Sequence, residues 1–291
     1  MNEELDHLLE TARQAARSAA ERIRDIYQQY LSGGSIDIRD KGVDDPVTAA
    51  DMSANQIITR AVKEAFPHHA ILTEEEPHTW SETGHEWVWM IDPLDGTRDF
   101  IKANGEFVTM VGATHHAEPT IGVVIEPATG LELCAVKSGG AYKSSLSKVE
   151  KPTKITAPPS PDLKGLRIAI SRSHRDSKVD ELIRLLGVQA EISSGSVGRK
   201  MALVIHGQAD LYVHPSRGTK LWDTCACEVI ASEAGLVLLS GTGEPIQYHR
   251  PSGDVENRYG LLMCSPAIVD KVVWATRKVW GLDCRPEENI Y

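Results

Sequence analysis

The sequence predicts a mixed α and β protein in two lobes, an α+β lobe over residues 1–155 and an α/β lobe over residues 156–291. Three observations lead to this fold class. Two segments with helically spaced apolar residues precede a run of strand-like segments, which is typical of an α+β arrangement. A stretch rich in proline, serine and lysine over residues 147–165 indicates a surface connection. Beyond it, strand-like and helix-like segments alternate, as in α/β structure.

In the first lobe, apolar residues at helical spacing predict a long helix over residues 3–30, which Leu-Ser-Gly-Gly-Ser ends. A second helix is expected from about residue 50 to residue 66, before Pro67. Short strands are expected over residues 68–76, running into acids, and over residues 86–92. Residues 106–116 and 120–144 predict consecutive antiparallel strands with Pro and Gly at the turns.

In the second lobe, strands are expected over residues 166–171, 209–214 and 236–240. The helices expected between them cover residues 176–187, 198–207 and 223–235. We find no internal repeat and no low-complexity segment, so the chain is expected to build one large core in two packed lobes.

The composition of 31 Lys and Arg against 41 Asp and Glu gives a formal net charge of −10. This charge argues against nucleic acid or an anionic membrane as the partner. A polyanionic ligand would therefore need a local cation. No stretch approaches the ~20 apolar residues of a membrane span, so we expect a cytoplasmic protein, either a monomer or a homodimer.

Several tempting residues have ordinary explanations. The five cysteines are an odd number without a spaced framework, so reduced thiols are expected, with Cys225 and Cys227 packed in a helix. The sequence Gly-Ser-Val-Gly-Arg-Lys over residues 195–200 lacks the spacing of a Walker A motif, the phosphate-binding loop of nucleoside triphosphatases. The pairs at residues 68–69 and 115–116 are expected to be solvated turn histidines.

Four acidic clusters flank or end apolar segments. They contain Asp44, Asp45 and Asp51 in the first, Glu74 to Glu76 in the second, Asp92 and Asp95 in the third, and Asp223 in the fourth. Each cluster alone is explained by helix capping or by solvation. Together they place carboxylates next to a core, where unpaired charges are costly and a cation is needed. Oxygen ligands, including a turn carbonyl such as that of Leu94, suit Mg²⁺ or Ca²⁺ rather than Zn²⁺.

Gly96 and Thr97 follow the acids at once, and they add an anion site to the hypothesis. Glycine lets the backbone approach a ligand closely, and the amide groups of a turn that opens a helix bind anions. A phosphate could therefore bridge metals and amides. Metal-assisted hydrolysis of a phosphate ester follows as a hypothesis, in which the metals activate a water and stabilise the leaving alkoxide.

Four motifs carry a family resemblance: DPVTAAD (45–51), ILTEEE (71–76), WMIDPLDGTRDF (89–100) and LWDTCACEVIASEAG (221–235). In this order and spacing they resemble the lithium-sensitive, magnesium-dependent inositol monophosphatase superfamily, over about residues 40–240. The resemblance implies a layered αβαβα sandwich of the inositol monophosphatase and fructose-1,6-bisphosphatase type. Within that superfamily, the sequence most resembles the 3'(2'),5'-bisphosphate nucleotidases, which convert 3'-phosphoadenosine 5'-phosphate to AMP. DGTRDF with NGEF, SRSH (171–174) and KLWDTCACEVI carry that narrower resemblance.

The resemblance also implies roles for individual residues. Two or three Mg²⁺ ions would be held by Glu74, Asp92, the Leu94 carbonyl, Asp95 and Asp223. Asp51 and Thr97 would hold and deprotonate the attacking water, with Glu75 assisting from outside the direct ligands, and the Gly96 and Thr97 amides would hold phosphate. Ser171, His174 and Lys200 would line the nucleotide side. The family commonly has glycine where this chain has Thr73, and Glu74 is the favoured ligand among the three glutamates.

The leading hypothesis is therefore a magnesium-dependent phosphatase that acts on a small phosphorylated substrate, an adenine nucleotide. The alternative within the same class is an inositol phosphate or sugar phosphate monoesterase, because the metal core is shared. The alternative from another class is a non-catalytic module that binds metal and phosphate. Asp51 and Thr97 speak against the module, since a binding protein needs no pair that activates water.

Overall fold

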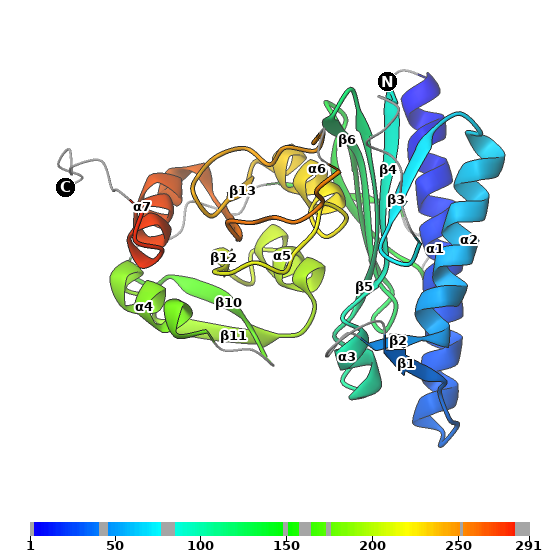
Figure 1. Cartoon of the computed structure of the whole chain (residues 1–291), viewed down its shortest axis with the longest axis horizontal. Helices are drawn as coiled ribbons and strands as arrows, with labels where there is room; N and C mark the ends of the chain where they lie inside the picture. Colours follow the sequence, from blue (N-terminus) through cyan, green and yellow to red (C-terminus); the bar gives the residue numbers. More distant parts are fainter. Residues whose placement is uncertain are drawn as a thin grey trace.

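The computed structural model describes residues 3–40, 46–76, 85–147, 151–156, 164–172, 176–250 and 253–282. Five layers follow one another across the molecule (Figure 1). They are a helix pair, a seven-stranded sheet, a second helix pair, a five-stranded sheet and an outer helix pair. The αβαβα sandwich expected from the sequence resemblance is confirmed.

The first helix pair is α1 (Glu3–Leu31) and α2 (Ala49–Ala65), which cover one face of the large sheet. The alanine-rich stripe of α1 is buried there together with apolar residues of both helices and of the sheet. A two-stranded ribbon of β1 (Ile38–Asp40) and β2 (Pro46–Thr48) lies between the two helices in the chain.

The large sheet has the order β3-β4-β5-β6-β7-β8-β9. Its strands are β3 (Ala70–Thr73), β4 (Trp87–Asp95), β5 (Val108–His115), β6 (Glu118–Glu126), β7 (Leu131–Val136), β8 (Gly140–Ser145) and β9 (Thr153–Ile155). Only the β3–β4 pair is parallel among these strands. The short helix α3 (Thr97–Ile101) follows β4 directly.

The second sheet has the order β11-β10-β12-β14-β13. Its strands are β10 (Arg167–Ser171), β11 (Ala190–Ser194), β12 (Leu211–His214), β13 (Val237–Ser240) and β14 (Leu261–Cys264). The outer layer is α4 (Ser177–Leu186) and α7 (Val269–Val279), the latter after a 3₁₀ turn over Pro266–Ile268. The proposed division of the chain after residue 155 falls between β9 and β10 and stays a prediction.

The central layer is α5 (Val197–Ile205) and α6 (Cys225–Glu233), whose apolar residues share one core with both sheets. Gly112 on β5 and Gly122 on β6 are directly paired, and a Cβ atom at Gly112 would lie 2.7 Å from the backbone nitrogen of Ala226. The missing side chains thus let α6 lie close against the sheet. Cys225 and Cys227 are fully buried in this contact, as expected from their packing. Within the described ranges no helix has the length and apolar character needed to cross a bilayer.

Candidate active site

Asp92 and Asp95 lie at the C-terminal end of β4, where the pairing with β5 shifts register between these two residues. Pro93 has no amide to offer the ladder, and its carbonyl accepts a hydrogen bond from the Thr109 hydroxyl at 2.9 Å. The irregularity breaks the strict alternation of side chains along the strand, so the two carboxylates need not point to opposite faces. The negative charge of Asp95 adds to the effect of burial in raising the pKa of Asp92.

Glu74 and Asp223 bring carboxylates to the same place from other elements. Glu74 follows β3, which is parallel to β4, and its amide donates to the Ile91 carbonyl at 3.2 Å. Asp223 precedes α6 and accepts from the Lys220 amide at 2.5 Å. Burial, and then the neighbouring carboxylates, raise the pKa of both Asp92 and Asp223 well above the usual range. Four acids from three parts of the chain therefore form one cluster, and the close approach of α6 to β5 supplies the last of them.

Asp51 and Thr97 form a second, adjoining unit. The Thr97 hydroxyl lies 2.8 Å from Asp51 Oδ1 and 3.2 Å from the Leu94 carbonyl oxygen. Asp51 is 1% exposed and belongs to a capping box with Thr48, whose amide and hydroxyl both donate to Asp51 Oδ2. Burial raises the pKa of Asp51, although these hydrogen bonds oppose the rise. The carboxylate is thus held rigidly and made more basic.

Gly96 connects β4 to α3 in the left-handed region, with φ 102°. A Cβ atom there would lie 2.9 Å from the Glu106 carbonyl oxygen, so both the conformation and the space require glycine. Thr97 begins α3, which fixes the backbone that carries its hydroxyl.

The residues that hold Asp95 were not predicted from the sequence. Ser196 and the amide of Gly198 each donate to Asp95 Oδ2 at 2.6 Å. A Cβ atom at Gly198 would lie 2.5 Å from Met110 Sδ, so the start of α5 must carry glycine to come this close. Residues 195–200, which lack the spacing of a triphosphate-binding loop, therefore hold the Asp95 carboxylate in place. The signal available in the sequence was Ser196, with Gly195 before it and Gly198 after it, at the start of a helix.

Asn55 was also missed, and it orients the glutamate segment. Its amide accepts from the Thr73 hydroxyl at 2.7 Å and donates to Glu76 at 2.7 Å, which ties α2 to the end of β3. Glu76 is exposed and directed towards Asn55, whereas the charge of Glu74 acts on the pKa of both Asp92 and Asp223. Glu75, next to Glu74 in the chain, is partly buried.

A further missed residue, Glu106, joins the two sheets. It makes a two-point ion pair with Arg172 at 2.7 and 2.8 Å, and it accepts from the Gly195 amide at 2.7 Å. Burial alone would raise its pKa, but these partners lower it overall. Arg172, which directly follows β10, is thereby held next to the loop that follows α3.

Of the three residues expected on the nucleotide side, the structure describes Ser171 and Lys200. Ser171 ends β10, opposite Ser194 on β11. Lys200 is 4% exposed and donates to the Ser196 carbonyl at 2.6 Å, and burial lowers its pKa to about 8. His174 lies outside the described residues, as do Asp44 and Asp45 of the first acidic cluster.

Comparisons with known proteins agree with one another. A model of the inositol monophosphatase family matches residues 4–273. The 3'(2'),5'-bisphosphate nucleotidase CysQ of Escherichia coli K12 is 35% identical over 243 residues, which cover 83% of this chain and 94% of that protein. The crystal structure of CysQ from Bacteroides thetaiotaomicron, a bacterial member of the inositol monophosphatase family, has a TM-score of 0.74 at 28% identity and covers 89% of this chain and 97% of its own. The suhB protein of Bartonella henselae shares the fold, with a TM-score of 0.78 at 21% identity over 94% of this chain and 99% of its own.

Proposed function

The chain belongs to the inositol monophosphatase family, and we propose that it is a magnesium-dependent 3'(2'),5'-bisphosphate nucleotidase. The substrate would be 3'-phosphoadenosine 5'-phosphate, and the products AMP and inorganic phosphate. The observation that carries the chemistry is the buried carboxylate cluster next to the Asp51–Thr97 pair. The choice of a nucleotide substrate is supported by the CysQ relatives, which are 35% and 31% identical to this chain in Escherichia coli K12 and Aggregatibacter actinomycetemcomitans.

The carboxylate cluster fits a hard divalent cation. Burial raises the pKa of Asp92, and the charges of Glu74, Asp95 and Asp223 add to the rise. Such a cluster is stabilised by positive charge, and its ligand atoms are all oxygen, as Mg²⁺ requires. Glu74, Asp92, the Leu94 carbonyl, Asp95 and Asp223 would hold two or three ions. When bound, Mg²⁺ would lower the pKa of water and stabilise the charge on the phosphoryl and leaving oxygens.

The protein's own groups would then position and deprotonate the water. Asp51 is the base, because it is fixed by Thr48 and its pKa is raised towards the range useful for proton transfer. The Thr97 hydroxyl donates to Asp51, so one of its lone pairs can accept a hydrogen bond from the attacking water. Glu75, which follows Glu74 in the chain, would assist from outside the ligand set.

The phosphate would be held by the Gly96 and Thr97 amides, at the turn where α3 begins. Ser171 and His174 would contact the nucleotide, and Ser171 directly precedes Arg172, which Glu106 holds in a two-point ion pair. The amine of Lys200 bonds to the Ser196 carbonyl, so its contribution would be to the electrostatics of this side.

Initial rates on a substrate panel test the proposal. The protein is incubated with Mg²⁺ and 3'-phosphoadenosine 5'-phosphate, inositol 1-phosphate or fructose 1,6-bisphosphate, and phosphate release is followed. The nucleotide should be hydrolysed with the highest kcat/KM. Fast release from inositol 1-phosphate without turnover of the nucleotide would identify an inositol phosphatase instead. Metal-dependent binding without turnover of any substrate would identify a binding module.

A further inference from the structure

The hairpin between β5 and β6 carries two adjacent histidines in an unusual conformation. His115 ends β5, and the next two residues, His116 and Ala117, have φ of 49° and 66°. Positive φ at both central residues makes a tight hairpin turn in which Asn and Gly are the common choices. Positive φ is uncommon for residues other than glycine, and histidine is among those that adopt it more often than most.

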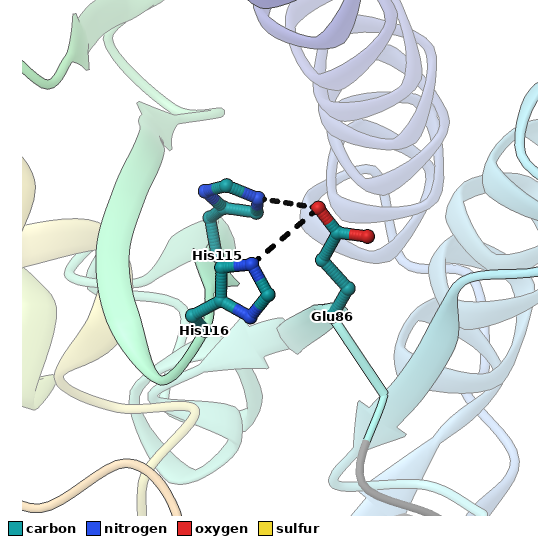
Figure 2. Close-up of side chains that lie close together, drawn as sticks. All are labelled: Glu86, His115 and His116. Atoms are coloured by element: carbon teal, nitrogen blue, oxygen red, sulfur yellow. Dashed lines mark hydrogen bonds and ion pairs between the residues drawn. The ribbon is translucent and has the colours of Figure 1, made fainter.

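The turn places both imidazoles together. Neighbouring side chains of a regular strand point to opposite faces. Here the His115 and His116 ring centroids are 4.3 Å apart, because the backbone turns left-handed at His116. Figure 2 shows both rings directed at the carboxylate of Glu86.

Glu86 completes the group from the start of β4. Its carbonyl accepts from the His116 amide at 2.8 Å, which extends the β4–β5 ladder by one step. Its Oε1 lies 2.8 Å from His115 Nε2 and 3.5 Å from His116 Nε2. The three ligand atoms lie within 4.8 Å of one another.

The position of the first ring is fixed by packing. Trp87 is buried at 6% exposure, and its ring stacks on that of His115 at 4.5 Å between centroids. The opposite neighbour of Trp87 is His69, stacked at 5.7 Å. A ligand atom on a ring held in this way loses little freedom on binding.

Two imidazole nitrogens and one carboxylate are a ligand set for a borderline transition-metal ion. Bonds of about 2.0 Å in a tetrahedron separate the ligand atoms by about 3.3 Å, and the observed 2.8 and 3.5 Å bracket that value. The side chains are 38–69% exposed, which leaves room for water at the fourth position. Mg²⁺, which prefers oxygen, does not suit this set.

We propose that Glu86, His115 and His116 bind a divalent transition-metal ion of the Zn²⁺ type. The site lies at the opposite end of β4 from the carboxylate cluster. Six residues separate Glu86 from Asp92, or about 20 Å along a strand. A metal bound here does not reach the reacting atoms, and its binding is independent of the phosphatase reaction proposed above.

The test is calorimetric titration of the untagged protein with Zn²⁺ in excess Mg²⁺, supported by the visible absorption of Co²⁺, which is intense only in tetrahedral sites. The variants are His116→Asn, which keeps a residue favoured at positive φ, and the isosteric Glu86→Gln. His68→Asn, an exposed histidine outside the group, is the matched control.

Wild type and His68→Asn should bind one Zn²⁺ equivalent and show the Co²⁺ bands. His116→Asn and Glu86→Gln should each lose at least about tenfold in affinity, with Mg²⁺-dependent turnover unchanged. Undiminished affinity in His116→Asn, or no Zn²⁺ uptake by wild type in excess Mg²⁺, would show that the three side chains form only a surface ion pair.

Discussion

Gly112→Ala should damage the carboxylate cluster without touching any of its residues. The new Cβ atom would lie 2.7 Å from the Ala226 nitrogen and 2.8 Å from Cys225 Sγ, against 3.4 Å for an ordinary contact. The first of these neighbours is backbone, so α6 must move away from β5 by about 0.7 Å. Asp223 stands two residues before α6 and would move with it.

Two magnitudes follow from that displacement. Overpacking of a well-filled core lowers the free energy of unfolding by about 1–3 kcal/mol. Because a misplacement of about 1 Å can cost a hundredfold in rate, we expect kcat/KM to fall at least about tenfold. The Mg²⁺ concentration for half-maximal rate should rise as well, since Asp223 would no longer lie correctly beside Asp92 and Asp95.

Urea unfolding and rates against Mg²⁺ concentration measure both effects. Gly165→Ala is the control, because a Cβ atom there meets nothing within 4 Å, and its stability should stay within about 0.5 kcal/mol of wild type. If Gly112→Ala matched Gly165→Ala in stability and in Mg²⁺ dependence, the close packing of α6 would not be what positions Asp223.

Three further predictions concern the water pair, a buried acid and the metal. Thr97→Ala should lower kcat at least about a hundredfold with little change in melting temperature. Thr97→Ser keeps the hydroxyl that donates to Asp51 and should retain most of the activity. Equal rates in the two variants would exclude a role for the hydroxyl. Burial raises the pKa of Glu228 from 4.5 to about 7, so the native state keeps a proton that the unfolded chain loses, and stability should fall by about 3 kcal/mol between pH 4.5 and 7. Glu228→Gln should flatten that dependence in urea unfolding, and an unchanged slope would place the titration elsewhere. Millimolar Ca²⁺, with its looser geometry, should inhibit turnover in the presence of Mg²⁺, as should Li⁺ by family resemblance; rates insensitive to both would speak against the metal site.

The long elements were predictable because their apolar periodicity is strong. The helices over residues 3–30 and 50–66 and the antiparallel run after residue 106 are confirmed as α1, α2 and β5 to β8. Other elements lacked such a signal. The strand β11 is mostly exposed and polar, α3 has five residues, and β14 is a four-residue apolar run after a long irregular segment. None of these three elements was therefore predicted from the sequence.

For the candidate site, chemistry was easier to predict than position. The acids were visible as charges beside apolar segments, but their convergence depends on the shift between Asp92 and Asp95 and on a glycine contact in the middle of β5. Ser196 and Glu106 could not be assigned, since their partners are about a hundred and about 65 residues away in the chain. The histidines at residues 115 and 116 do lie at an exposed turn, as expected, but Glu86 joins them only through the pairing of β4 with β5.

The phosphorus NMR spectrum of 3'-phosphoadenosine 5'-phosphate during incubation with the protein and Mg²⁺ tests the proposed function most directly, because it separates the two phosphate groups of one molecule. The 3'-phosphate resonance should disappear while inorganic phosphate appears, the 5'-phosphate should remain, and Asp92→Asn should leave the spectrum unchanged. Loss of the 5'-phosphate, or an intact nucleotide after prolonged incubation with wild-type protein, would contradict the proposed nucleotidase.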